Sequence, residues 1–214
     1  YIASLVLPNV RSLYEGERMF GIGGDKMVQA GLEAWYPSSK LAVRGYVEVL
    51  RRLPELFMLQ REMKKRVLEI NPRAFIGVDA PDFNLDIELF LRQRGIKTIH
   101  FVCPSIWAWR PERIHKIKEA VDHMLLVFPF EKKLMDEAGI ESTYIGHPLA
   151  RVIPMQPDKE LARQRLSIEA NGPVFAIMPG SRQAEVAWCG PHFFAACDRI
   201  LDFDPRSRFI VPAS

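Results

Sequence analysis

The sequence lacks the features that mark several large classes of protein. Its three cysteines, Cys103, Cys189 and Cys197, are odd in number and share no C-x-x-C spacing, so we expect reduced thiols rather than a disulfide framework or a zinc site. No apolar run approaches the roughly 18–20 residues that span a bilayer. The 29 basic and 26 acidic residues leave a formal charge of +3, which is too small to indicate a nucleic-acid partner.

What the 214 residues do contain is a regular alternation of short apolar runs and longer segments of helical period. Because the runs are continuous and apolar, as in strands covered on both faces, the alternation predicts an α/β protein with a parallel sheet. Gly95 and Gly139 stand where helices would end, and Asp158 where one would begin. The expected strands are 19–22, 74–78, 98–102, 124–128, 142–145, 174–178 and 208–211, and the expected helices are 84–94, 112–121, 130–138 and 159–166.

The composition changes between residues 147 and 173, where proline, asparagine and glycine surround a single polar helix. A new strand and a new glycine-containing turn follow, which predicts a linker into a second α/β unit. We expect one domain over 1–155 and the start of another over 156–214. The chain opens at Tyr1 inside an apolar stretch and closes on a β-rich run, so we interpret it as a piece cut from a longer protein.

The turns after the strands are the expected places for ligands, because a parallel sheet binds them beyond its carboxyl ends. Asp79, Asp82 and Asn84 follow the strand at 74–78. We expect Asp79 to be the extended last residue of that strand and a candidate general base. Asp82 and Asn84 are candidates for binding sugar hydroxyl groups. The alternative is that one of them caps the next helix.

Aromatic and cationic side chains follow the next strand. Trp107 and Trp109 could stack on a sugar ring or line an acyl groove, and Arg110 could bind a phosphate with two hydrogen bonds. Packing of one indole in the core and one in an interface is an equally good explanation for either ring alone. His147, between a glycine and a proline, is a weaker candidate for contacting a ligand.

Two glycine-containing segments have the composition of phosphate-binding turns. Ser181 and Arg182, with Glu185 after them, follow a buried strand and open a helix, where free N–H groups favour an anion. A helix cap with a surface arginine is the alternative. Residues 21–24, after the first strand, have the glycines of a phosphate turn, but they do not match G-x-G-x-x-G and the signal is weak.

The segment 45–70 interleaves apolar residues with arginine and lysine, and we expect Pro54 to divide it into two helices. An apolar face rimmed by cations is typical of an interfacial membrane contact. It is also typical of an ordinary amphipathic helix on a sheet, and periodicity does not decide between the two. The candidate membrane-contact residues are Val47, Val49, Leu50, Leu53, Leu56 and Phe57.

In their order and spacing, eight segments over essentially the whole chain resemble the lipid-A-disaccharide synthases, glycosyltransferases of Gram-negative bacteria. The segments are 20–24 (Phe-Gly-Ile-Gly-Gly), 47–50 (Val-Glu-Val-Leu), 77–84 (Gly-Val-Asp-Ala-Pro-Asp-Phe-Asn), 95–100 (Gly-Ile-Lys-Thr-Ile-His), 105–110 (Ser-Ile-Trp-Ala-Trp-Arg), 128–131 (Phe-Pro-Phe-Glu), 145–148 (Ile-Gly-His-Pro) and 179–182 (Pro-Gly-Ser-Arg).

The resemblance implies a Rossmann-like fold of glycosyltransferase-B type, with this chain holding the acceptor-side domain and the beginning of the UDP-sugar-binding domain. It implies an enzyme without a metal or other cofactor that joins the diacylglucosamine of UDP-2,3-diacylglucosamine to 2,3-diacylglucosamine 1-phosphate, with inversion and release of UDP. It also implies a cytoplasmic enzyme peripheral to the inner face of the inner membrane, and leaves the oligomeric state open, a homodimer included.

In this mechanism Asp79 would be the base and Ser181 and Arg182 would bind the departing diphosphate. The family's Gly-Glu-x-Ser-Gly-Asp turn would precede Tyr1 and most of its uridine contacts would follow residue 214, so we expect the chain to be inactive alone. The alternatives are another glycosyltransferase-B enzyme that uses a UDP-sugar, or a non-catalytic α/β module that binds a lipid or a membrane.

Overall fold

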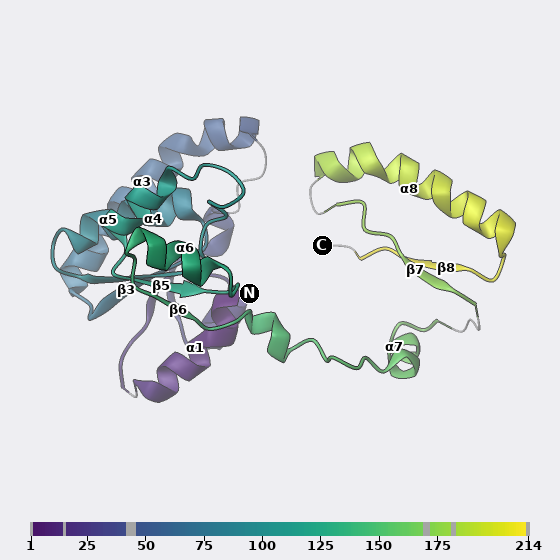
Figure 1. Cartoon of the computed structure of the whole chain (residues 1–214), viewed down its shortest axis with the longest axis horizontal. Coiled ribbons are helices and arrows are strands. Elements are labelled where there is room, and N and C mark those ends of the chain that lie inside the picture. The colour runs from purple at the N-terminus through teal and green to yellow at the C-terminus, as the bar shows by residue number, and fades with distance from the viewer. Residues whose placement is uncertain (1, 15, 42–45, 169–171, 181–182, 213–214) are drawn as a thin grey trace. The chain divides into compact units, whose positions relative to one another are not determined.

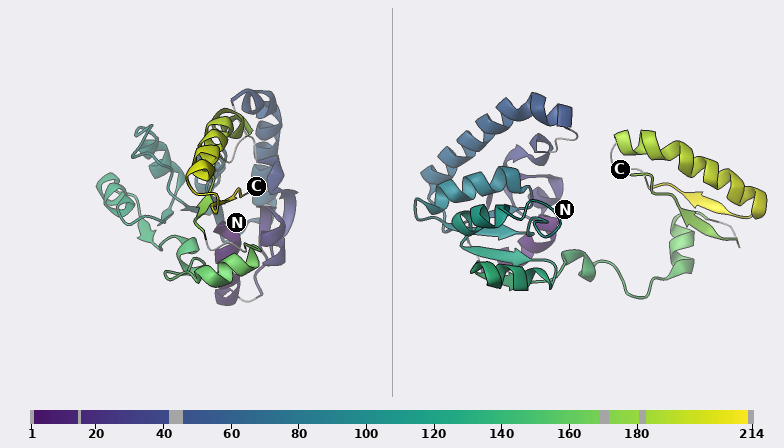
Figure 2. Two further views of the ribbon diagram at one scale, coloured as in Figure 1. Left: turned by 90° about the vertical axis from the view of Figure 1, so that its right-hand side faces the viewer. Right: turned by 45° about the horizontal axis from the view of Figure 1, so that its top comes forward.

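The chain folds into two compact units, residues 1–153 and 154–214, in the computed structural model. The structure describes residues 2–14, 16–41, 46–168, 172–180 and 183–212, with the side chains of 46–51 excepted. Figure 1 shows the ribbon of the whole chain, and Figure 2 shows it from two further directions.

The first unit is built around parallel strands. A pair, β1 and β2, and a four-stranded sheet in the order β3-β4-β5-β6 are both entirely parallel, so the prediction of a parallel α/β protein is confirmed. The elements are α1 (Ile2–Leu13), β1 (Phe20–Gly23), α2 (Asp25–Gln29), β2 (Glu33–Pro37), η1 (Ser38–Lys40), α3 (Tyr46–Ile70), β3 (Ala74–Val78), α4 (Pro81–Arg92), β4 (Lys97–Phe101), α5 (Arg113–Ala120), β5 (His123–Leu126), α6 (Glu131–Ala138), β6 (Ser142–Tyr144) and η2 (Pro148–Arg151).

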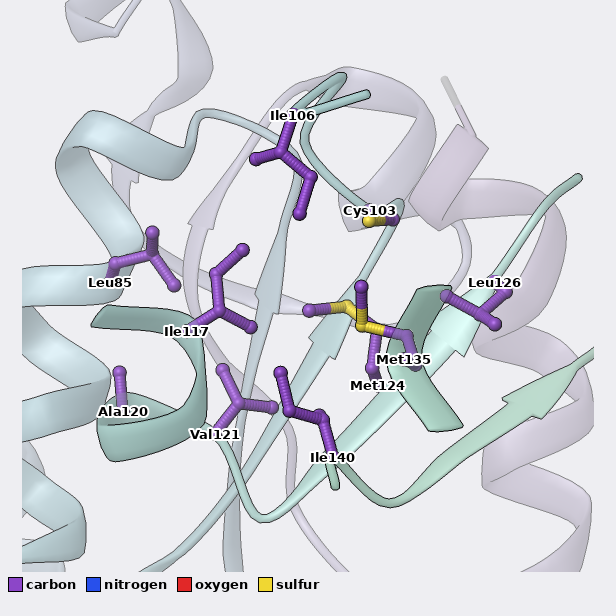
Figure 3. Packing of buried hydrophobic residues seen from close by; sticks show 10 residues of the cluster. All are labelled: Leu85, Cys103, Ile106, Ile117, Ala120, Val121, Met124, Leu126, Met135 and Ile140. Carbon is purple, nitrogen blue, oxygen red and sulfur yellow. The ribbon is translucent and has the colours of Figure 1, made fainter. Parts of the chain in front are cut away.

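Two apolar clusters hold the helices to the four-stranded sheet. In the first cluster, buried side chains of α3, of α4 and of the turn after α4 pack together. Examples are Leu59 of α3, Ile87 of α4 and Ile96 of the turn. In the other, ten buried side chains from Leu85 to Ile140 converge between α4, α5, α6 and β5, as Figure 3 shows. Helices α3, α4 and α5 lie side by side (Figure 1). The burial of this apolar surface favours the packing of the helices against the sheet.

The ends of three helices lie where local features of the sequence predict them. Gly139 ends α6 at φ +65° and Gly95 follows α4 at φ +81°, the left-handed region that glycine adopts without a Cβ clash. The side chain of Asp158 accepts a hydrogen bond from the backbone N–H of Leu161, 2.9 Å away, and caps α7. These positions were predictable because each depends on neighbours in the chain.

The prediction that Pro54 divides the segment 45–70 is wrong, because α3 is one helix of 25 residues with Pro54 inside it. A proline removes one backbone hydrogen bond and crowds the preceding turn. Here the buried side chains of Leu59, Met63 and Val67 line one face of the helix after the proline. Their packing, together with the two ion pairs that Glu55 makes with Lys40 and Arg52, outweighs the lost bond.

The glycines of 21–24 lie mostly in the first strand, because Gly21 and Gly23 belong to β1 and Gly24 is the N-cap of α2. A Cβ atom on Gly23 would stand 2.3 Å from a methyl carbon of Leu32. This glycine therefore allows close packing against the chain that leads into β2, a strand not predicted from the sequence. The rings of Phe20 and Trp35 stack across the two strands with centroids 5.6 Å apart.

The second unit contains α7 (Lys159–Arg165), β7 (Val174–Ala176), α8 (Gln183–Phe203) and β8 (Arg208–Ile210). Strands β7 and β8 are parallel, and α8 lies along one side of the pair (Figures 1 and 2). A strand, a helix and a second parallel strand form the right-handed unit from which Rossmann-like sheets are built. Within the described residues of both units, no helix is long and apolar enough to cross a membrane.

Candidate active site at the carboxyl ends of the strands

The carboxyl ends of β3, β4, β5 and β6 lie along one edge of the four-stranded sheet, because all four strands are parallel. The turns that leave this edge are 79–80, 102–112, 127–130 and 145–147. They carry most of the side chains that the sequence singled out. The edge is therefore the candidate active site of the first unit.

Asp79 leaves the end of β3 with its side chain exposed. Its backbone N–H donates to the carbonyl oxygen of Phe101, 2.9 Å away. The prediction of an extended Asp79 is wrong: Asp79 has φ +53°, and Ala80 after it has φ +43°. Pro81 restricts Ala80, its direct neighbour, and not Asp79. Two consecutive left-handed residues other than glycine are strained and persist only where surrounding contacts hold them.

Asn84 supplies such contacts from the first turns of α4. Its buried side-chain amide donates to the carbonyl oxygens of Val78, at 3.3 Å, and Asp79, at 2.7 Å. Helical side chains point back towards the N-terminus, which brings this amide to the strand end. The predicted cap by Asp82 or Asn84 is wrong, because the N-cap residue is Ala80. Asn84 holds the turn that presents Asp79.

A buried acid–imidazole pair lies behind the same strand end. One oxygen of Glu88 is 2.8 Å and the other 3.1 Å from Nδ1 of His100, and both side chains have no exposed surface. Removal of the Glu88 carboxyl from water raises its pKa, and the hydrogen bond with His100 opposes that shift. A Cβ on Gly77 would stand 2.0 Å from a Glu88 oxygen, so only glycine leaves room for this pair. Sequence reasoning did not identify either residue.

Asp82 is exposed and forms an ion pair with Arg113, at the start of α5. The guanidinium carbons of Arg110 and Arg113 lie 4.5 and 5.5 Å from the ring centroid of Trp109, within the range of cation–π attraction. The structure thus brings together three predicted site residues, Asp82, Trp109 and Arg110. Arg113 was not predicted as a site residue. Its position three residues after Arg110 was the signal in the sequence that could have identified it.

Trp107 belongs to a second group of rings at the same edge. It meets Phe130 edge to face with centroids 5.2 Å apart, and Phe130 stacks on Phe128 at 5.7 Å. The ring of His147 is 6.2 Å from that of Phe128, and its Nδ1 accepts from the backbone N–H of Leu149, 3.2 Å away. The two phenylalanines were missed as site residues, although Phe128-Pro129-Phe130 directly follows a strand.

Glu131 is hydrogen-bonded to two residues of this group, Trp107 and Phe128. Its side chain is 1% exposed, and one oxygen accepts from the backbone N–H of Phe128 at 3.1 Å. Burial raises the pKa of Glu131, while hydrogen bonds from the N–H groups of Phe128 and Val127 and from the Trp107 side chain lower it. The carboxyl group therefore ties the turn after β5 to the loop after β4.

The remaining predicted residues lie elsewhere or outside the described part. Ser181 and Arg182 lie outside the described residues. Glu185 is half-buried, with its Cβ 2.5 Å from the position of a Cβ on Gly180. The side chains of Val47, Val49 and Leu50 are also outside the description. Leu53 and Leu56 are half-buried, whereas Phe57 is 63% exposed and Met58 beside it 73%.

The parallel sheet and the polar and aromatic turns at its carboxyl edge define a Rossmann-like α/β protein. The family model that matches the chain adds that this fold is of glycosyltransferase-B type. The chain belongs to the lipid-A-disaccharide synthetase family, whose family model matches residues 1–214.

Its sequence is similar to those of several lipid-A-disaccharide synthases. The protein of Paraburkholderia phymatum is 54% identical over 195 residues, which are 91% of this chain and 50% of that protein. The protein of Burkholderia cenocepacia strain HI2424 is 50% identical over 214 residues, 100% of this chain and 55% of its own. The protein of Paraburkholderia xenovorans is 49% identical over 212 residues, which are 99% of this chain and 54% of that protein. The chain thus spans about half the length of the curated relatives it matches.

Proposed function

We propose that this chain is the acceptor-side part of a glycosyltransferase that forms lipid A disaccharide from UDP-2,3-diacylglucosamine and 2,3-diacylglucosamine 1-phosphate and releases UDP. The family membership and the names of the relatives support the reaction. The observation that carries the assignment of a catalytic residue is the exposed Asp79, held in a strained turn at the carboxyl end of β3 by Asn84 and the backbone of Phe101.

Asp79 has the role of general base in this proposal. A sugar hydroxyl group has a pKa far above 7, so it must lose its proton as it attacks the anomeric carbon. The hydroxyl oxygen forms the new glycosidic bond while the bond from the anomeric carbon to the UDP oxygen breaks, and Asp79 takes the proton. A single in-line displacement inverts the anomeric carbon without a covalent enzyme intermediate. Asn84 and the strand end keep the carboxylate in place during this step.

UDP departs with negative charge, which side-chain cations, hydroxyl groups and backbone N–H groups can stabilise. We assign this role to Ser181 and Arg182, with Glu185 on the helix that follows them. In this arrangement the first unit binds the acceptor and the second begins the UDP-sugar domain. Asp82, Trp109, Arg110 and His147 are proposed contacts for the acceptor.

Both proposed substrates carry acyl chains, so the enzyme would take them from a bilayer surface. We propose a peripheral location at the inner face of the inner membrane, with the N-terminal part of α3 as the contact. The exposed side chains of Phe57 and Met58 support this assignment, since large exposed apolar groups side by side mark interaction sites.

The test of Asp79 is the substitution Asp79→Asn in a full-length synthase that carries these 214 residues. The change keeps the shape of the side chain and removes its basicity, so kcat should fall by roughly 10²–10⁴-fold while substrate binding is retained. Asp86→Asn is the matched control, because Asp86 lies on α4, the helix that follows Asp79, and pairs with Lys116 at 2.6 Å. UDP release gives the rate. A near-normal kcat in the Asp79 variant would exclude the general-base role.

A further inference from the structure

An apolar groove of about 480 Å³ opens between the loop after β4 and the helices α5 and α6. Ile106, Trp107 and Trp109 line it from the loop, and Ile114 and Leu134 line it from the two helices. Glu137 is the one charged residue among those that line it. A concave, mostly apolar site of this size has the usual character of a small-molecule site.

The groove continues into an exposed aromatic surface. Trp107, which lines the groove, also contacts Phe130, and Phe130 stacks on Phe128. We call these three residues the aromatic cluster. Their exposed fractions are 53%, 52% and 43% respectively. Phe130 contacts both of the other rings, and all three remain about half exposed. They form an apolar patch that favours a partner over solvent.

The aromatic cluster is tied to Glu131 and exposes ring carbon atoms rather than hydrogen-bonding groups. The Trp107 side chain is hydrogen-bonded to the buried Glu131, and Glu131 also accepts from the backbone N–H of Phe128. The indole N–H is therefore engaged inside the protein, and the exposed faces of the three rings are hydrocarbon. Sugar hydroxyl groups need donors and acceptors beside a stacking ring, whereas an alkyl chain needs only apolar surface.

The position of this surface matches the proposed chemistry. The loop that lines the groove follows β4, the direct neighbour of β3, and the phenylalanines follow β5, so both segments leave the edge that carries Asp79. From this loop the groove extends between α5 and α6. Trp109 also lines the groove, and the guanidinium groups of Arg110 and Arg113 lie near its ring. An acylated sugar bound at this edge would present a polar head to the arginines and carboxylates and an alkyl chain to the groove.

We infer that the groove and the aromatic cluster together bind a fatty acyl chain of the acylated sugar acceptor. This inference rests on the proposed function for the chemical class of the ligand. It assigns Trp107 to the acyl chain rather than to the sugar ring, and it adds Phe128, Phe130 and the groove side of α6 to the binding site.

The experiment uses a full-length synthase and a series of diacylglucosamine 1-phosphates with increasing chain length, each below its micelle-forming concentration. Equilibrium binding is measured by calorimetry, and KM is measured beside it. Each fully buried methylene contributes about fourfold in affinity, so binding to the wild type should tighten with chain length. Phe130→Ala removes part of the cluster, and Ala108→Phe places a ring at the groove, where Ala108 is exposed. Both should lower the long-to-short affinity ratio by about tenfold or more.

Tyr14→Ala is the matched control, because Tyr14 is 52% exposed at the end of α1 and belongs to neither the groove nor the cluster. It should leave the ratio unchanged. Equal weakening at every chain length would assign the rings to the sugar and overturn the inference, as would an unchanged ratio in both variants. Altered binding to phospholipid vesicles with an unchanged ratio would assign the surface to the membrane instead.

Binding and turnover separate this inference from the proposed function. If the wild type binds the series with a chain-length dependence that the variants lose, but transfers no sugar, the acyl site stands and the proposed reaction fails. If transfer occurs with every acceptor and chain length has no effect on binding, the reaction stands and the acyl site fails.

Discussion

The side-chain amide of Asn84 lies 2.7 Å from the carbonyl oxygen of Asp79 and donates a hydrogen bond to it. Asn84 is a residue of α4, whereas Asp79 follows β3, so this bond ties the helix to the turn that bears the proposed base. The same amide reaches the carbonyl of Val78 at 3.3 Å. The left-handed conformations of Asp79 and Ala80 are thus held by a side chain five residues further along.

Asn84→Asp should lower kcat more than it raises KM, because a carboxylate would face two carbonyl oxygens and could donate to neither. We expect a loss of about 1–3 kcal/mol in the free energy of unfolding and a displaced Asp79. Urea denaturation and steady-state kinetics measure the two effects. Asn9→Asp, on the exposed surface of α1, is the control. Full activity with unchanged stability in Asn84→Asp would show that the hydrogen bonds do not hold the turn.

Gly77→Ala should destabilise the first unit by about 1–3 kcal/mol, the usual range for overpacking. The added methyl carbon would stand 2.0 Å from a Glu88 oxygen and 3.0 Å from Cβ of Asn84. Gly190→Ala is the matched control, because its methyl would only meet a ring carbon of Phe194 at 3.8 Å. Chemical denaturation compares them, and equal stability of the two variants would contradict the close packing of Glu88 on β3.

Glu131→Gln should change how stability depends on pH. Burial raises the pKa of Glu131 above its ordinary value of 4.5, so the folded state holds the proton more tightly than the unfolded state. The wild type therefore has this contribution in full below pH 4.5 and loses it as the pH rises through the raised folded pKa. The stability of the wild type relative to Glu131→Gln should accordingly fall over that range. A constant difference in denaturant midpoint would contradict the raised pKa.

Cys103 should react slowly with iodoacetamide at pH 8 in the folded protein. Burial, with the nearby Glu131 carboxylate, raises the pKa of its thiol to about 12, and only the thiolate is an effective nucleophile. Cys189 is half-buried and should be labelled first. Mass spectrometry of labelled peptides gives the order, and unfolding in urea should make the cysteines equally reactive. Rapid labelling of native Cys103 would contradict its burial.

The double change Phe57→Ala and Met58→Ala should reduce the binding of the full-length enzyme to anionic vesicles, because both side chains are exposed in water and would be buried at a membrane. The thermal transition should stay where it is. Leu59→Ala is the contrast: Leu59 is 5% exposed in the apolar core, so its loss should cost about 2–5 kcal/mol of stability. Unchanged vesicle binding by the double variant would remove this surface from the membrane contact.

Much of the framework was predictable from the sequence because it depends on local physics. The strand at 74–78 was predicted with the bounds that β3 has, and the ends of the helices at Gly95 and Gly139 follow from glycine's freedom at positive φ. The α/β alternation, and with it the edge where ligands bind, follows from continuous apolar runs between helical periods. The family was predictable from the sequence as well, because the resemblance to it lies in short segments of the chain.

The sequence alone therefore determined the class of fold, the family and the edge of the sheet at which polar and aromatic residues gather. Only the tertiary structure decided that Pro54 lies inside one helix, that Asp79 is left-handed, and that Arg113 pairs with Asp82, 31 positions earlier. It likewise decided which rings touch Trp107. The physical reason is that these features arise from contacts between residues far apart in the chain, whose packing overrides local preference.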